Sequence, residues 1–283
     1  MGTIRTIAGE FRGTPTMDGA GVRLNRVFGF SEEGLFDPFL LLDFFGSDNP
    51  KEYQAGFPWH PHRGMETVTY MLEGLVEHGD SLGNKGMLGK GDVQWMTAGS
   101  GIIHQEMPKP PADGRMFGFQ LWVNLPASHK MMPPRYQDIP SASIPGVLTE
   151  DSIKVKVIAG SFQSVKGPVS DIVADPLYLD VTVPVGAEFI LPVNPGYTVF
   201  AVVFEGSGYF SPAKDYPVGS ITAVLLKEGD EIFACPESED FRFLLISGKA
   251  LNEPVAWRCP IVMNTEDELR QAFKELQHGT FIK

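Results

Sequence analysis

Residues 60–66 read HPHRGME, and residues 99–106 read GSGIIHQE. In each stretch, two side chains with metal-binding atoms stand two residues apart. These four side chains are His60, His62, His104 and Glu106. Because side chains alternate between the two faces of a strand, residues two apart point to the same face. If the two stretches are neighbouring antiparallel strands, all four side chains converge, and we expect a β-fold around one metal ion.

Three neutral imidazoles and one carboxylate form a mixed nitrogen and oxygen set, which suits Fe(II), Mn(II), Ni(II), Cu(II) or Zn(II). No thiolate lies nearby, which argues against a closed structural zinc site. In octahedral geometry, four protein ligands leave two positions for water, substrate or dioxygen. The two cysteines, Cys235 and Cys259, show no CxxC spacing, so we expect free thiols in a reducing compartment.

The rest of the chain also predicts β-structure. Apolar residues make up 43% of the 283 residues, and the 31 glycines and 23 prolines suit many short strands joined by tight turns. Apolar and polar residues alternate, which is typical of strands. The strands expected from this pattern are Thr67–Leu72, Phe117–Val123, Val155–Ile158, Leu177–Val183, Thr198–Phe204, Ile221–Leu226 and Phe241–Ile246.

One helix is expected, near the C-terminus. Thr265 and Glu268 form a capping box at its start. Leu269, Phe273 and Leu276 then fall on one face, and Gly279 follows the last turn. We expect this apolar stripe to pack against a barrel.

The chain contains a weak internal repeat. Placing residues 59–74 over residues 191–206 without gaps aligns Gly64 with Gly196, and the Gly–Asp step at residues 91–92 answers the one at residues 229–230. The proline-rich stretch from residue 126 to 145 is the best linker candidate. We therefore expect two tandem β-domains, residues 1–130 with the metal ligands and residues 131–283 ending in the helix.

The second half lacks the ligands in this alignment. Pro192 and Asn194 stand where His60 and His62 stand, and no second metal site is expected. Two further residues, Arg242 and Leu244, fall opposite His104 and Glu106. The isolated His78, in a turn-like stretch, is expected to be solvated.

Beyond the site, composition excludes some classes of function. The net charge is −12 with no basic run longer than two residues, so direct nucleic-acid binding is not expected. The sequence shows no secretory signal and no apolar stretch long enough to span a membrane. We expect a soluble cytoplasmic protein, or a nuclear one if the source is eukaryotic.

Residues 60–68, HPHRGMETV, and residues 94–101, QWMTAGSG, resemble the pirin family of the cupin superfamily. Flanking stretches share the resemblance: DPFLLLD at residues 37–43, LWVNLP at residues 121–126 and VMNT at residues 262–265. The resemblance covers nearly the whole chain and is densest over residues 22–140. It implies an all-β bicupin of two tandem jelly-roll barrels, with a short C-terminal helix and Fe(II) in the N-terminal barrel.

The resemblance also ranks two glutamates that spacing alone does not rank. Glu66 lies four residues after His62, an even separation that keeps both on one side of a regular strand. The general cupin pattern makes such a glutamate the ligand. Resemblance to pirins implies instead that Glu106 binds the metal, and that Glu66 lies next to the metal ligands without binding the metal itself. We therefore take both as candidate catalytic residues, with Glu106 as general base.

For function, the pirin resemblance implies quercetin 2,3-dioxygenase activity, in which a flavonol and dioxygen are the substrates. The alternative is a metal- or redox-sensitive regulatory module that binds a protein partner without turning over a flavonol. Another small-molecule cupin activity, such as an isomerase, would use the same four ligands. A monomer is expected, because two fused barrels bury the surface that single cupins usually hide by dimerising.

Overall fold

The structure, a computed structural model, describes residues 2–283 and divides into two compact units. The first barrel comprises residues 14–33, 39–141 and 251–283. The second barrel comprises the residues up to Gly13 together with residues 34–38 and 142–250. The units depart from the expected boundary at residue 130, because the N-terminal strand β1 pairs within the second barrel and the C-terminal segment packs within the first.

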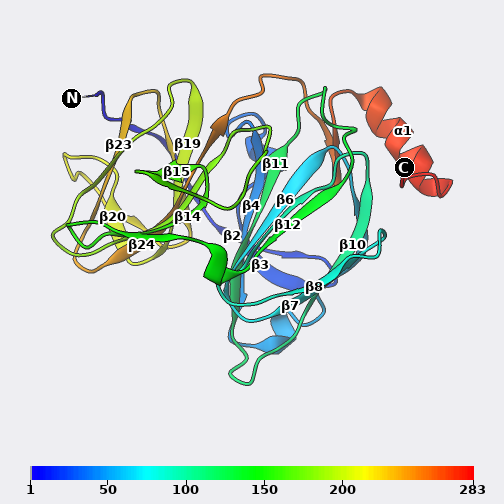
Figure 1. Cartoon of the computed structure of the whole chain (residues 1–283), viewed down its shortest axis with the longest axis horizontal. Coiled ribbons are helices and arrows are strands. Elements are labelled where there is room, and N and C mark those ends of the chain that lie inside the picture. The colour runs from blue at the N-terminus through cyan, green and yellow to red at the C-terminus, as the bar shows by residue number, and fades with distance from the viewer. Residues whose placement is uncertain (1) are drawn as a thin grey trace. The chain divides into compact units, whose positions relative to one another are not determined.

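The first barrel is built from two antiparallel sheets (Figure 1). Its seven-stranded sheet has the order β12-β9-β6-β11-β4-β3-β2, with β2 (Thr14–Asp18), β3 (Val22–Phe28), β4 (Phe39–Ser47), β6 (Met65–Glu73), β9 (Val93–Thr97), β11 (Met116–Asn124) and β12 (Arg135–Ile139). Its four-stranded sheet has the order β5-β10-β7-β8, with β5 (Phe57–His62), β7 (Val76–Asp80), β8 (Lys85–Leu88) and β10 (Ile102–Pro108). A core of buried side chains from both sheets, including Leu24, Met71, Val76 and Leu88, joins the two layers.

The second barrel repeats this architecture. Its seven-stranded sheet has the order β1-β22-β19-β24-β17-β14-β13, with β1 (Ile7–Arg12), β13 (Gly146–Leu148), β14 (Lys154–Ala159), β17 (Leu177–Val183), β19 (Tyr197–Glu205), β22 (Thr222–Leu226) and β24 (Phe241–Lys249). The four-stranded sheet has the order β18-β23-β20-β21, with β18 (Phe189–Pro192), β20 (Ser207–Tyr209), β21 (Val218–Gly219) and β23 (Glu231–Pro236). The short pair β15 (Ser161–Phe162) and β16 (Val165–Lys166) is an addition. The predicted all-β bicupin fold is thus confirmed.

Equal strand order gives each strand of one barrel a counterpart in the other. β6 corresponds to β19, as the gapless alignment predicted, but β10 corresponds to β23. The placement of Arg242 and Leu244 opposite His104 and Glu106 is therefore wrong, because both lie on β24, the counterpart of β11. The matching of the two Gly–Asp turns caused this error. The turn at residues 91–92 precedes β9, whose counterpart is β22, whereas the turn at residues 229–230 precedes the next strand, β23.

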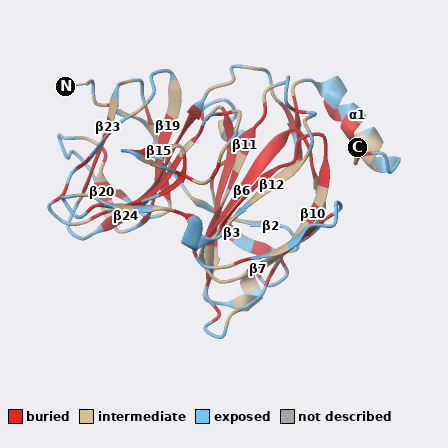
Figure 2. Cartoon of the chain, viewed as in Figure 1, coloured by how far each residue is buried: buried red, intermediate tan, exposed pale blue. Residues whose placement is uncertain are grey.

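The C-terminal segment contains a hairpin, β25 (Ala256–Arg258) and β26 (Ile261–Met263), followed by α1 (Glu266–Gln277). The predicted capping box of Thr265 and Glu268 is present. Leu269 and Ala272 of α1 pack with the hairpin and with Ile103 of β10, so the helix covers the first barrel. Figure 2 shows buried residues along β6 and β11 and a mostly exposed α1.

Smaller elements complete the chain. The described residues form three 3-10 helices: η1 (Phe30–Glu32), η2 (Pro50–Glu52) and η3 (Ser141–Ser143). The segment from residue 126 to 145, expected to be a linker, also contributes a strand to the first barrel, because it contains β12, which pairs with β9. Across residues 2–283, no helix has the length and apolar character needed to cross a bilayer. Cys235 and Cys259 are free thiols, as expected.

Candidate metal centre

Three histidines meet on the four-stranded sheet of the first barrel. His60 and His62 lie on β5, and His104 of β10 is paired directly opposite His60. The ring centroids are 4.3 Å apart for His60 and His104, 4.9 Å for His60 and His62, and 5.0 Å for His62 and His104. One nitrogen of each ring lies within 4.8 Å of the others, and within residues 2–283 this is the one group of three such residues. The two predicted sequence pairs do bring their histidines together.

The surroundings of these rings fit a bound metal. Nδ1 of His60 lies 2.8 Å from the carbonyl oxygen of Pro58, and Nδ1 of His62 lies 3.2 Å from that of Pro260. An Nδ1–H that donates to a carbonyl leaves Nε2 with a free lone pair for a metal. His104 is buried, and neither of its ring nitrogens has a hydrogen-bond partner among the described residues. Buried polar atoms are rarely left unpaired, and a metal ion would supply a partner for one of these two nitrogens.

The protonation state of the histidines also suits a metal. Burial lowers the pKa of His62 well below its usual value, and the neighbouring His60 lowers it further. The pKa of His104 is likewise lowered by burial, then by the adjacent histidines. Both rings are therefore neutral near pH 7, which is the form that binds metals.

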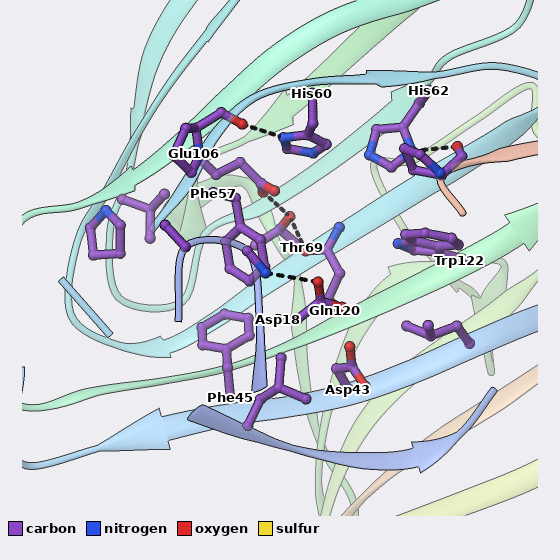
Figure 3. Close-up of a pocket in the computed structure, with 18 of the residues that line it drawn as sticks. Asp18, Asp43, Phe45, Phe57, His60, His62, Thr69, Glu106, Gln120 and Trp122 are labelled. Carbon is purple, nitrogen blue, oxygen red and sulfur yellow. Dashed lines mark hydrogen bonds between the residues drawn. The ribbon is translucent and has the colours of Figure 1, made fainter. Parts of the chain in front are cut away.

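Glu106 lies on the same wall but outside the 4.8 Å group. The hydroxyl of Thr69 lies 3.2 Å from Oε1 of Glu106, and Figure 3 shows the carboxylate between His60 and Thr69. Burial raises the pKa of Glu106, whereas His60 and the Thr69 hydrogen bond act to lower it. The structure thus places Glu106 where it can face the histidines and hold or accept a proton.

The structure does not bring Glu66 to the histidines. β5 ends at His62, and Gly64, with φ +76°, turns the chain into β6, so the even spacing spans two strands. Glu66 and the cavity-lining Thr69 lie three residues apart on β6 and so face opposite sides. The Glu66 carboxylate accepts a hydrogen bond from the Thr97 hydroxyl at 2.6 Å, and burial raises its pKa.

His60 and His62 line a cavity of about 490 Å³. Most of its wall is apolar: Leu24, Leu41, Phe45, Phe57, Trp59, Val76, Met116 and Trp122. Its polar side chains, apart from the histidines and Glu106, are Asp18, Asp43, Thr69 and Gln120. Cys259 and Pro260 of the C-terminal segment complete the wall. This volume and lining are typical of a site for an aromatic small molecule with a few polar groups.

The expectation that His78 is solvated is wrong. The side chain is 3% exposed, and it lies directly opposite Glu106 in the β7–β10 pair. It stacks on Tyr136 with ring centroids 5.9 Å apart. Gly86 on β8 leaves room for the ring, because a Cβ there would lie 2.3 Å from Nε2 of His78. His78 is therefore an interior residue beside Glu106.

Comparison with known proteins identifies the family. The family model for pirin matches residues 21–123, and that for the pirin C-terminal cupin domain matches residues 178–282. A pirin-like protein of Caulobacter vibrioides is 45% identical over 279 residues, which cover 98% of this chain and 99% of that protein. The chain belongs to the pirin family. Membership confirms the resemblance on which the predicted bicupin fold rested.

Some relatives of this pirin family member carry names that state an activity. A Pseudomonas aeruginosa protein named as a candidate quercetin 2,3-dioxygenase is 44% identical, with 94% of each chain covered. The crystal structure of a quercetin 2,3-dioxygenase from Acinetobacter baumannii superposes with a TM-score of 0.90, at 35% identity and 98% coverage of each chain. A nickel(II) complex of an Escherichia coli pirin superposes with a TM-score of 0.66 at 20% identity, covering 86% of this chain and 99% of the other. That last likeness shows the shared fold.

Proposed function

We propose that this pirin family member is a metal-dependent dioxygenase that opens a flavonol ring, with His60, His62, His104 and Glu106 as the metal ligands. The observation that carries the proposal is three converging histidines, two of which line the wall of an aromatic-lined cavity. The candidate activity of the P. aeruginosa relative and that of the A. baumannii protein support the same reaction class.

Fe(II) is the metal that we propose first, and Mn, Ni, Cu or Zn are substitutes that the same ligands accept. When bound, the metal supplies Lewis acidity and a net charge of about +1, which favours an anionic oxygen such as a deprotonated 3-hydroxyl. We assign to Glu106 the role of taking the proton of that hydroxyl, since Glu106 lines the cavity and accepts a hydrogen bond from Thr69. The electron-rich flavonol is then attacked by dioxygen at C2, and the ring opens with release of carbon monoxide.

The remaining wall positions the flavonol and excludes water. Trp122 packs edge-on against His62, with ring centroids 5.2 Å apart, and both line the cavity. Phe57 and Phe45 provide apolar surface for a flat ring. Trp59 is 55% exposed, so part of the aromatic wall reaches solvent.

Turnover by metal-reconstituted protein tests this function. Metal-free protein is loaded separately with Fe(II), Mn(II), Ni(II), Cu(II) and Zn(II) and mixed with quercetin in air. Loss of the flavonol absorbance together with carbon monoxide release is the expected result. His62→Ala should abolish both, whereas His129→Ala, which changes an exposed histidine outside the cluster, should not. Metal binding without turnover would instead favour the regulatory module that presents a metal-dependent surface to a protein partner.

A further inference from the structure

A row of polar side chains crosses the seven-stranded sheet of the first barrel. Strand register places Thr69 opposite Gln120, Gln120 opposite Asp43, and Asp43 opposite Arg26. Residues that are directly paired across antiparallel strands share a face. Thr69, Gln120 and Asp43 line the cavity, and Figure 3 shows Gln120 between Thr69 and Asp43. Three of the four residues of the row therefore form part of the cavity wall.

The second barrel shows that the fold does not require this polarity. Its equivalent row runs through Ala201, Leu245, Leu179 and Val157, all of them buried in the barrel core. The same sheet order can thus be completed by aliphatic side chains. Polar side chains in the first barrel serve a purpose other than closing the barrel.

The Thr69 hydroxyl faces two acceptor oxygens at once, and the way this is resolved indicates the role of the row. The Thr69 hydroxyl lies 3.2 Å from Oε1 of Glu106 and 2.8 Å from Oε1 of Gln120. A hydroxyl has one hydrogen, so it can donate to only one of these oxygens. A metal-bound Glu106 is ionised and can only accept. Turning the Gln120 amide by half a turn satisfies all three groups: the NH₂ donates to Thr69, and Thr69 donates to Glu106.

We propose that Gln120 is a specificity-determining residue, an inference that rests on the proposed function. With its NH₂ directed at Thr69, the Gln120 carbonyl faces the cavity as a hydrogen-bond acceptor. It accepts from a hydroxyl of the ligand, so the site selects aromatic ligands that carry a hydroxyl donor on the side facing the sheet. The neighbouring Asp43 is held by Arg26, which donates to its two oxygens at 2.9 and 2.8 Å. Thr69 is a positioning residue, because its hydroxyl accepts a hydrogen bond from Gln120 and donates one to Glu106.

Ligand discrimination without turnover tests the Gln120 carbonyl. Nickel(II)-loaded protein is titrated anaerobically with quercetin and with quercetin ethers methylated at one hydroxyl at a time, followed by tryptophan fluorescence. Wild type should bind one of these ethers about tenfold more weakly than quercetin. Gln120→Met should reduce that difference to about twofold or less. Equal discrimination in wild type and Gln120→Met, or none in wild type, overturns the proposal.

Metal affinity tests the link through Thr69 and needs no flavonol. Thr69→Val should weaken cobalt(II) binding about tenfold and change the visible spectrum of the bound ion, because Glu106 loses its donor. Thr69→Ser keeps the hydroxyl and should restore both. Wild-type affinity and spectrum in Thr69→Val overturn the link. If wild type binds cobalt(II) but no flavonol, the proposed function fails, the recognition role of Gln120 fails with it, and the Thr69 result still decides the link to Glu106.

Discussion

Thr69 in the first barrel and Ala201 in the second occupy the same place on corresponding strands, 132 positions apart in the chain. The Thr69 hydroxyl contacts Glu106 and Gln120 at the edge of a cavity. Ala201 is fully buried among aliphatic neighbours. The comparison teaches that one strand order can enclose a site or a solid core, and that side chains on the inner face decide which. Each of the first three predictions below changes one barrel and uses the corresponding position in the other barrel as the control.

The largest effect is expected for removal of a ligand. His104→Ala should weaken metal binding by more than about 100-fold, because even outer partners of ligands contribute 10- to 100-fold. Glu231→Ala, at the counterpart position in the second barrel, should leave metal binding unchanged. Calorimetric titration with nickel(II) measures both. An equal loss of nickel(II) affinity in the two variants would show that the metal does not bind specifically at the histidines of the first barrel.

The next effect concerns two corresponding glycines. Gly64 and Gly196 have φ values of +76° and +74°, so an alanine at either position bears similar backbone strain of about 1 kcal/mol. A Cβ at Gly64 would also lie 1.9 Å from the carbonyl oxygen of Val262, whereas nothing lies within 4 Å of one at Gly196. Gly64→Ala should therefore lower the free energy of unfolding by about 3 kcal/mol or more, and Gly196→Ala by about 1 kcal/mol. Urea unfolding of the two variants measures this difference.

A smaller difference in stability is expected when a polar and an apolar side chain are exchanged at the corresponding positions 120 and 245. Leu245→Gln places an amide in the aliphatic core of the second barrel and should cost roughly 3 kcal/mol of unfolding free energy, from lost burial and an unpaired polar group. Gln120→Met replaces a cavity-lining amide and should change stability by less than about 1 kcal/mol. Similar losses in both variants would indicate that the polar row supports the first barrel rather than its ligand.

The sequence predicted the parts of the site whose spacing lies within one strand. His60 and His62 share β5, so a separation of two was sufficient to bring them together. The even spacing between His62 and Glu66 did not keep them on one side of a strand, because it spans the turn at Gly64. The burial of His78 depends on the pairing between β7 and β10, and the residues around His78 in the sequence do not predict that pairing.

Other residues of the site were missed although the sequence carries a signal for one of them. Asp43 interrupts the apolar run from Phe39 to Phe45, and a charged residue inside such a run is a sign of a functional interior. Thr69 and Gln120 carry no such signal, because polar residues are normal on alternating strands. Their meeting with Asp43 depends on register across three strands, which only the folded sheet reveals.

The smallest expected effect is a pH dependence confined to the first barrel. Burial lowers the pKa of His62 and His104, so below their unfolded pKa of about 6.5 the unfolded state binds more protons than the folded state. Stability of the metal-free protein should then fall as pH drops through about 6.5, by up to about 1.4 kcal/mol per pH unit for each histidine.

Two buried glutamates oppose this dependence. The raised pKa values of Glu66 and Glu106 stabilise the folded state as pH falls, so the histidine contribution is the difference between wild type and a His62→Gln, His104→Gln variant. Urea unfolding at pH 7.0 and 5.5 should show a larger loss in wild type than in this variant. The same loss in both would mean that the buried histidines are already charged in the folded barrel, and a charged imidazole cannot bind a metal.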